Sequence, residues 1–192
     1  MGQHPPLALV AGAGAGLGQS LLSRLQRGGF HVVGLGRTRP DKVVGEFDSI
    51  DLADEVAVPT LIETIIADYG PPKIVIHNTA ELIIAPFATT KLADYQRTWI
   101  SQVQTAVLLA QATLQPMVLK DGGTFIVSGA TASLRGGAIS RPLPAQSLRC
   151  GACHNRSRVN INPQVCMFAT SFLMELLTPF GLARCMPLTL IR

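Results

Sequence analysis

The sequence predicts an α/β fold, a doubly wound parallel sheet with helices on both faces that is incomplete at its C-terminal end, and three observations support this. Short apolar runs alternate with longer segments of helical periodicity from residue 7 to about residue 128. A glycine-rich turn separates the first apolar run from the first helical segment. The 192 residues are 47% hydrophobic and 15% charged, which suits one compact domain. Strands that alternate with helices form parallel sheets through right-handed crossovers.

The first elements follow this pattern closely. Leu7–Ala11 is an apolar run that ends in glycines, as a buried parallel strand does. A helix is expected over Leu17–Gly28, with one apolar face formed by Leu17, Leu21, Leu22 and Leu25. His31–Gly36 is the second expected strand, and a third ends near Asp51. The stretch between them is too short for a full helix and a strand, so this crossover helix is expected to be reduced to a turn.

The later elements complete five strands. A helix over Asp54–Tyr69 is expected to face inward through Val58, Leu61, Ile62, Ile65 and Ile66. Lys73–His77 and Thr124–Ser128 are the fourth and fifth strands. Between them, Asp94–Leu119 is expected to form a long helix with an inward face of Trp99, Val103, Ala106, Val107, Ala110 and Leu114.

The composition changes near residue 138. Up to Ala138 there are 10 Lys and Arg against 11 Asp and Glu, whereas residues 139–192 hold six Arg, one acid and all four cysteines. This basic segment lacks Lys and interleaved aromatic residues, so no nucleic-acid partner is expected. The chain has no apolar run of about 20 residues and no basic, apolar leader, so we expect no membrane span and a cytoplasmic location.

The turn after the first strand is the motif that carries chemistry. Glycines stand at positions 12, 14, 16 and 18, and the spacing is G-x-x-x-G-x-G. A glycine permits a tight turn out of the strand, and missing Cβ atoms let the backbone approach a pyrophosphate. The following helix presents free N–H groups and its positive end to an anion. The pattern favours a dinucleotide site over a ligand-free flexible loop.

The end of the second strand favours NADP. Dinucleotide sites for NAD place an acid about 20 residues after the glycine turn, where it holds the ribose hydroxyls. Here Gly36 stands at that position, and Arg37 follows it. A guanidinium suits a 2′-phosphate, so NADP is expected and NAD is the weaker alternative. The other interpretation of Arg37 is a solvated surface arginine.

These motifs together make residues 1 to about 138 resemble the short-chain dehydrogenase/reductase family, in an atypical subgroup. The resemblance rests on AGAGAGLG at 11–18, on Asp51-Leu52, on the sequence HNTA at 77–80 where the family has Asn-Asn-Ala-Gly, and on GGTFIVSGATASLRGG from residue 122. It implies a Rossmann-type NAD(P)-binding domain and a homo-oligomer formed through the 94–119 helix. The cofactor residues that it implies, with those predicted above, are Gly12, Ala13, Gly14, Gly16, Leu17, Gly18, Arg37, Asp51, Leu52, Asn78, Thr79 and Ala80.

The family's four catalytic residues are not retained. Position by position, the asparagine falls on Gln102, the serine on Ala130, the tyrosine near Leu143 and the lysine near Ser147. The Tyr-x-x-x-Lys match at Tyr69 and Lys73 encloses two prolines, which exclude the helix that such a pair needs. No catalytic residue is therefore assigned.

The basic segment contains a competing motif. Cys150, Cys153 and His154 form C-x-x-C-H, the attachment signature of c-type haem. Haem attachment requires export, and a zinc site that adds Cys166 would lack a second close pair. Both alternatives are therefore disfavoured, and no metal ligand is assigned.

A reading-frame change from about Gly137 would explain the altered composition. The codons for Pro142 to Asn162, read in a shifted frame, can encode a segment that resembles the family's active-site helix, lysine included. We therefore expect a dinucleotide-binding domain over residues 1–138 and an anomalous, poorly packed or disordered segment over 139–192. The function expected is an NADP-binding oxidoreductase by descent, acting on an unidentified small molecule if it acts at all. A non-catalytic binding protein or a decayed, frame-shifted product is the alternative.

Overall fold

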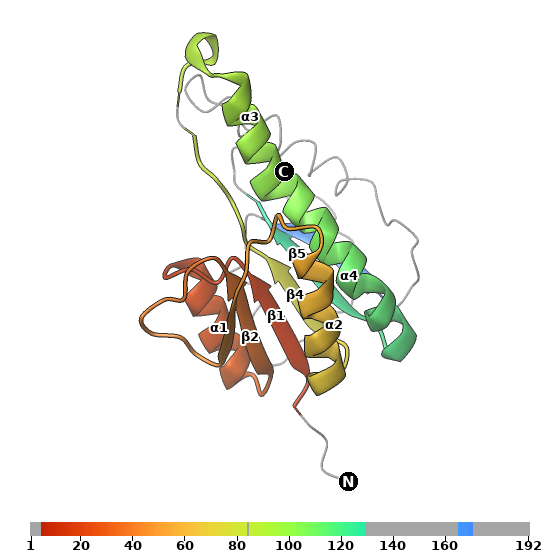
Figure 1. The fold of residues 1–192 in the computed structure, drawn as a ribbon. Helices are drawn as coiled ribbons and strands as arrows, with labels where there is room; N and C mark the ends of the chain where they lie inside the picture. Colours follow the sequence, from red (N-terminus) through yellow and green to blue (C-terminus); the bar gives the residue numbers. More distant parts are fainter. Residues whose placement is uncertain (1–4, 84, 130–164, 171–192) are drawn as a thin grey trace, which may run out of the picture.

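The computed structural model describes residues 5–83 and 85–129, and the backbone of 165–170. These residues form a six-stranded sheet in the order β3-β2-β1-β4-β5-β6, in which every pairing is parallel (Figure 1). The strands are β1 (Leu7–Ala11), β2 (His31–Gly36), β3 (Glu46–Ser49), β4 (Ile74–His77), β5 (Gly123–Ser128) and β6 (Val165–Thr170). The predicted doubly wound α/β fold is confirmed.

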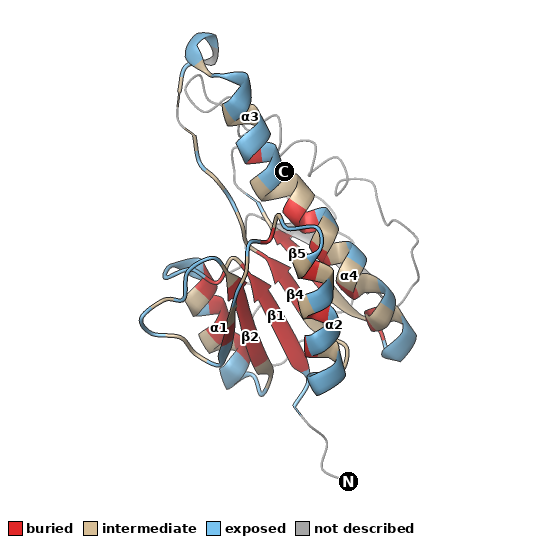
Figure 2. Ribbon diagram, viewed as in Figure 1, coloured by how far each residue is buried: buried red, intermediate tan, exposed pale blue. Residues whose placement is uncertain are grey.

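Helices cover both faces of this sheet. They are α1 (Leu17–Arg27), α2 (Ala57–Tyr69), a 3₁₀ turn at Phe87–Thr89, α3 (Leu92–Trp99), a π-helical turn at Ile100–Gln104, and α4 (Thr105–Lys120). The central strand β1 is buried along its whole length, and a separate apolar layer lies on each side of the sheet (Figure 2). One layer joins α1 to the sheet through Leu22 and Val10, and the other joins α2 and α4 through Ile62 and Leu109.

Helix α1 packs on the sheet largely as predicted, except at its first residue. Leu21, Leu22 and Leu25 are buried, but Leu17 is 46% exposed and Gly18 is buried in its place. A Cβ on Gly18 would lie 2.6 Å from the Gly12 carbonyl oxygen. The helix therefore contacts the backbone of the preceding turn through a glycine, and this close approach leaves the Leu17 side chain outside the core.

The short connection between β2 and β3 is confirmed. Residues 37–45 contain no helix, and Gly45 ends the connection with a φ of +77°. Its ideal Cβ would lie 2.5 Å from the Val32 carbonyl oxygen, so the chain can turn tightly against β2 only because Gly45 lacks a side chain.

Helix α2 begins three residues later than predicted, and Asp54 forms a hydrogen-bonded turn just before it. The Asp54 carboxylate accepts hydrogen bonds from the N–H groups of Val56 and Ala57, both at 2.9 Å. These two backbone N–H groups hold the pKa of Asp54 below its usual value. The predicted inward face is confirmed, with Val58, Ile62 and Ile65 buried and Leu61 and Ile66 packed at its margin.

The long helix is present, but its predicted inward face is only partly right. Of the predicted set, Ala106 is buried and Ala110 and Leu114 pack against the core, while Trp99 is 42% and Val107 48% exposed. The buried residues of the long helix are Thr98, Thr105, Ala106, Leu109, Thr113 and Met117.

Two physical causes explain this error. The π-helical turn adds a residue to one turn and shifts the phase of the helix at that point. In addition, the threonine hydroxyls donate hydrogen bonds to backbone carbonyls four residues earlier, so these polar residues can lie in the core. Thr113 Oγ1 donates to the Leu109 carbonyl at 2.7 Å, and Thr105 Oγ1 donates to the Ser101 carbonyl at 2.8 Å.

The segment expected to be poorly packed lies mostly outside the described residues. Val165–Thr170 is its described part, and it pairs in parallel with β5 from Gly123 to Ser128. Within the described ranges, no helix is both long and apolar enough to cross a bilayer. The boundary at residue 138 stays a prediction.

Candidate functional site

The predicted cofactor residues gather at one edge of the sheet. The glycine turn follows β1, Arg37 follows β2, Asp51 and Leu52 follow β3, and Asn78 to Ala80 follow β4. Strand order reverses at β1, since β2 lies on one side of it and β4 on the other (Figure 1). In open α/β sheets, this reversal point at the carboxyl ends of the strands is where ligands bind.

The glycine turn is held tightly at its start. The N–H groups of Gly12 and Ala13 both donate to the Leu35 carbonyl, at 2.8 and 3.1 Å. Gly12 has a φ of +82°, and a Cβ there would lie 2.5 Å from the Asn78 carbonyl oxygen. Any side chain at position 12 would therefore force β1 and β4 apart at the site.

The middle of the turn has the shape that a diphosphate requires. A Cβ built on Gly14 or on Gly16 meets no atom of the described chain within 4 Å, so the backbone there faces open space. Gly16 caps α1 without a side-chain hydrogen bond, and the first turn of α1 holds no acid. The N-terminus of α1 thus keeps its partial positive charge available for an anion. These residues fit the pyrophosphate of a dinucleotide.

The residues between the glycines face different surroundings. Ala13 is 1% exposed and packs in the α1 layer, and its carbonyl accepts a hydrogen bond from Gln19 Nε2 at 3.3 Å. Leu17 is exposed beside the turn. The Ala13 side chain is therefore part of the core, whereas the Leu17 side chain is exposed to solvent.

The adenosine side of the site is open. Arg37 is exposed after β2, and a Cβ on Gly36 would contact only Phe47 and the Ala13 nitrogen, at 3.5 Å or more. Asp51 is exposed, and its carboxylate accepts a hydrogen bond from the Ala53 N–H at 3.0 Å. Leu52 is 6% exposed, and its side chain packs in the α2 and α4 layer.

A cluster of polar side chains lies where the end of β4 meets the π-helical turn at Ile100–Gln104. His77 Nε2 lies 2.8 Å from Thr105 Oγ1 and 2.7 Å from Thr79 Oγ1. The hydroxyls of Thr79 and Thr105 both donate to the Ser101 carbonyl. A π-helical turn breaks the regular pattern of helix hydrogen bonds, and side-chain hydroxyls satisfy the carbonyl here. The cluster fixes Thr79 and the start of α4 relative to the sheet.

Burial lowers the pKa of His77 to about 4, so the ring is neutral at pH 7. The side chain is 1% exposed, and its Nδ1 atom has no hydrogen-bond partner in the part of the chain that the structure describes. A neutral histidine here acts as a structural contact between strand and helix. The sequence singled out residue 77 only as a departure from the family's asparagine, and it carried no signal for Ser101 or Thr105.

The positions of the family's catalytic residues fall in two groups. Gln102 lies in the π-helical turn and its Nε2 donates to the Glu81 carbonyl at 3.4 Å. Positions 130, 143 and 147 lie outside the described residues, as do Cys150, Cys153 and His154. Among the described residues, no group of three His, Cys, Asp or Glu side chains could hold a metal ion.

The prediction that no helix joins Tyr69 to Lys73 is confirmed. Helix α2 ends at Tyr69, and Gly70 follows with a φ of +81°. The Tyr69 hydroxyl donates to the Glu46 carboxylate at 2.8 Å, whereas Lys73 Nζ donates to the Asp121 carbonyl at 3.0 Å. The two side chains are thus engaged with different elements.

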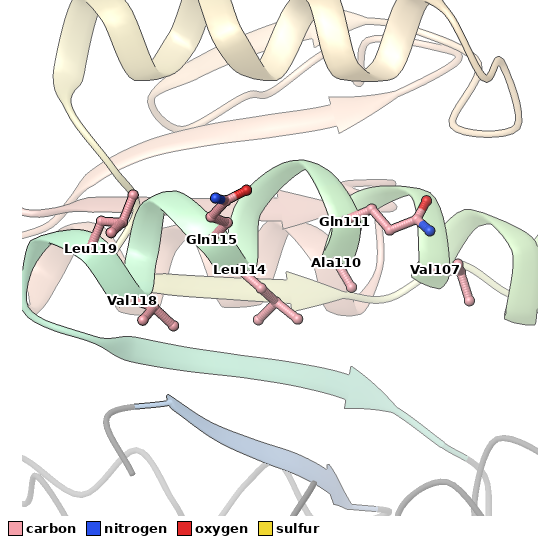
Figure 3. Close-up of a pocket in the computed structure, with 7 residues that line it drawn as sticks. All are labelled: Val107, Ala110, Gln111, Leu114, Gln115, Val118 and Leu119. Atoms are coloured by element: carbon pink, nitrogen blue, oxygen red, sulfur yellow. The ribbon is translucent and has the colours of Figure 1, made fainter. Parts of the chain in front are cut away.

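A groove elsewhere on the molecule runs along α4 (Figure 3). Its lining residues are Val107, Ala110, Gln111, Leu114, Gln115, Val118 and Leu119. Figure 3 shows Val107, Ala110, Leu114 and Val118 pointing to the side of α4 where β5 and β6 run. None of the predicted cofactor residues lines this groove, so the groove is separate from the candidate site at the carboxyl edge of the sheet.

Comparisons with known proteins agree with this architecture. A family model described as short chain dehydrogenase matches residues 6–142. L-xylulose reductase of Mesocricetus auratus is 27% identical over 150 residues, which cover 74% of this chain and 58% of the relative. L-xylulose reductase of Bos taurus is 27% identical over 180 residues, covering 83% of this chain and 71% of the relative. The chain thus spans little more than half of the first relative's length.

Solved structures share the fold at low sequence identity. Ligand-free aldohexose dehydrogenase of Thermoplasma acidophilum superposes with a TM-score of 0.81 at 12% identity, covering 87% of this chain and 66% of that one. NAD⁺-bound xylitol dehydrogenase gives a TM-score of 0.78 at 18% identity, covering 88% of this chain and 70% of that one. Since the family model spans well over half of the sequence, the chain belongs to the short chain dehydrogenase family.

Proposed function

We propose that this chain binds NADP(H) at the carboxyl edge of its sheet and is a poor catalyst of carbonyl reduction. The observation that carries the binding proposal is the turn after β1. Its Gly14 and Gly16 face open space at the uncapped N-terminus of α1, and no acid stands in the first turn of that helix. An anion placed there meets backbone N–H groups and the positive end of the helix.

The preference for NADP rests on Arg37. The residue is exposed at the end of β2, where enzymes specific for NAD carry a carboxylate. Gly36 before it leaves room, since the nearest atom to its ideal Cβ lies 3.5 Å away. The guanidinium can therefore bind a 2′-phosphate that a carboxylate would repel. One solved relative of the same fold is described as NADH-dependent, so the family's fold does not decide the preference.

We expect Arg37→Ala to abolish the preference for NADPH over NADH. The substitution should weaken NADPH binding about tenfold, the weight of one charge-assisted contact of roughly 1.4 kcal/mol, and should leave NADH binding unchanged. Fluorescence titration of the full chain with each nucleotide measures both constants. Arg27→Ala is the matched control, because Arg27 is exposed at the far end of α1 and carries the same charge. Equal loss of both nucleotides in Arg37→Ala would contradict the assignment.

The proposal of poor catalysis rests on residues that the sequence lacks. No Tyr follows Tyr95 and no Lys follows Lys120, so the segment after β5 supplies no Tyr–Lys pair for proton transfer. Positioned acid–base catalysis contributes typically 10²- to 10⁴-fold. With L-xylulose, the substrate in the names of the mammalian relatives, we expect NADPH oxidation slower than theirs by at least about 10²-fold. A turnover rate comparable to theirs would refute this proposal.

The remaining expectations stay predictions. The match to the family model ends at residue 142, which supports a change of character near the predicted boundary at 138. Sequencing the gene around the codons for Arg135–Ile139 tests the reading-frame hypothesis.

Sedimentation tests whether the protein is a homo-oligomer through the 94–119 helix. Absorption spectra test the disfavoured haem alternative, and metal analysis tests the disfavoured zinc alternative. The cytoplasmic location and the small-molecule substrate await direct tests.

A further inference from the structure

Three neighbouring strands are linked by a chain of side-chain hydrogen bonds at the candidate site. Ser128, at the end of β5, donates from Oγ to Asn78 Oδ1 at 2.9 Å. Asn78, directly after β4, donates from Nδ2 to the Gly12 carbonyl at 3.2 Å. Gly12 begins the glycine turn after β1. The two hydrogen bonds therefore link Ser128 to a turn that begins 116 positions earlier in the sequence. Both side chains are half-buried.

The Gly12 carbonyl sets which way the Asn78 amide points, and the Ser128 hydroxyl holds the amide there by donating to its acceptor end. An amide has a donor end and an acceptor end, and either could face the Gly12 carbonyl after a 180° rotation. With Oδ1 toward that carbonyl, two acceptors would face each other. A donor at Ser128 stabilises the other orientation, in which Nδ2 faces Gly12.

The backbone around Gly12 makes this orientation matter. The Asn78 N–H donates to the Ala11 carbonyl at 2.7 Å, and the ideal Gly12 Cβ lies 2.5 Å from the Asn78 carbonyl oxygen. The turn and the end of β4 are thus in close contact at one point. The Asn78 side chain adds a second hydrogen bond one residue further along the turn, to the Gly12 carbonyl. Gly14, which faces open space, lies two residues beyond Gly12.

We propose that Ser128 is a positioning residue for the dinucleotide: it holds the Asn78 amide against the Gly12 carbonyl and so fixes the turn that receives the diphosphate. This inference rests on the proposed function. Family resemblance did not point to Ser128, which stands two residues before Ala130, the family's serine position. Its hydroxyl acts on the cofactor through Asn78 and Gly12, without itself touching the nucleotide.

NADPH titration of four full-length variants tests the proposal. We expect Ser128→Ala to raise the Kd for NADPH about fivefold, the weight of one hydrogen bond of roughly 1 kcal/mol. Ser128→Thr keeps the hydroxyl and should restore the wild-type Kd. In an Asn78→Ala background, the further change Ser128→Ala should have no effect on Kd, because the hydroxyl then has no amide to hold.

The outcomes separate this inference from the proposed function. If the wild-type chain binds no NADPH, the proposed function fails. If the wild type binds and Ser128→Ala binds equally well, the positioning role is wrong. It is also wrong if Ser128→Ala weakens binding by the same factor with and without Asn78. Should Ser128→Ala fail to fold, the isosteric pair Ser128→Thr and Ser128→Val provides the comparison, and equal Kd values for the two would overturn the role.

Discussion

Replacing Gly14 by aspartate is expected to weaken NADPH binding strongly while leaving the protein folded. The ideal Cβ of Gly14 meets no described atom within 4 Å, and its φ lies outside the left-handed region, so a side chain fits. The new carboxylate would stand beside the N-terminus of α1, where a negative charge stabilises the helix by a few tenths of a kcal/mol. The same charge repels the diphosphate, and we expect a loss of affinity of about 100-fold, or roughly 3 kcal/mol.

Gly14→Asn is the matched control for this prediction, because asparagine has the same shape without the charge. It should bind NADPH far better than Gly14→Asp, and both variants should unfold at or above the wild-type temperature. Titration by nucleotide fluorescence and thermal unfolding of each variant provide the two measurements. If Gly14→Asp binds NADPH as tightly as Gly14→Asn, the turn is not the diphosphate site.

Acidification is expected to destabilise the fold through His77. The folded protein holds the pKa of this buried ring at about 4, whereas the unfolded chain has a value near 6.5. Between these two values the unfolded state binds a proton that the folded state does not. Stability is therefore unaffected above pH 6.5 and is lost as the pH falls toward 4, by a total of about 3 kcal/mol at roughly 1.4 kcal/mol for each pH unit.

The measurement is urea unfolding at pH 7, 5.5 and 4 for the wild type and for His77→Asn. The asparagine variant titrates at no pH in this range and retains an amide that can contact Thr105, whose hydroxyl lies 2.8 Å from the ring. Carboxylates affect both proteins alike, so the difference between them isolates the histidine. An acid-induced loss of stability as large in His77→Asn as in the wild type would contradict the buried neutral ring.

Sequence periodicity predicted most of the fold because parallel strands here are simple apolar runs. Every residue of β1 is buried, and its sequence LALVA is apolar throughout. The glycine turn was equally visible, because glycines are required at both of its close approaches: Gly12 against Asn78 and Gly18 against the Gly12 carbonyl. Composition and spacing were sufficient to predict an element wherever its geometry requires one type of residue, as a buried strand requires apolar residues and a close backbone contact requires glycine.

The long helix shows why periodicity failed elsewhere. Thr105 and Thr113 are polar by composition, but each donates its hydroxyl to a carbonyl within its own helix and so behaves as a core residue. Apolar Val107 and Leu119 remain 48% and 80% exposed. The spacing of apolar residues could not predict which face of this helix is buried. The hydrogen bonds of the threonine hydroxyls and the phase shift at Ile100–Gln104 depend on the three-dimensional structure.

The polar contacts of the site were out of reach of sequence reasoning for a related reason. His77 and Thr105 are 28 positions apart, and Ser128 and Asn78 are 50 apart. No local pattern joins such pairs; only the parallel pairing of β4 with β5 and the packing of the helix on the sheet bring them together. The segments that gather at the candidate site could be predicted, whereas the side-chain contacts that hold these segments in place could not.

The most direct test of the account is to observe the glycine turn itself during cofactor binding. In ¹H–¹⁵N spectra of the full chain, added NADP⁺ should shift the amide signals of Gly14, Gly16 and Gly18, which form the proposed diphosphate site. The amides of Gly70 and Gly123, at the opposite edge of the sheet, should stay unchanged. Saturating NADP⁺ that leaves the turn unaffected, or that shifts only signals away from it, would contradict a dinucleotide site at this turn.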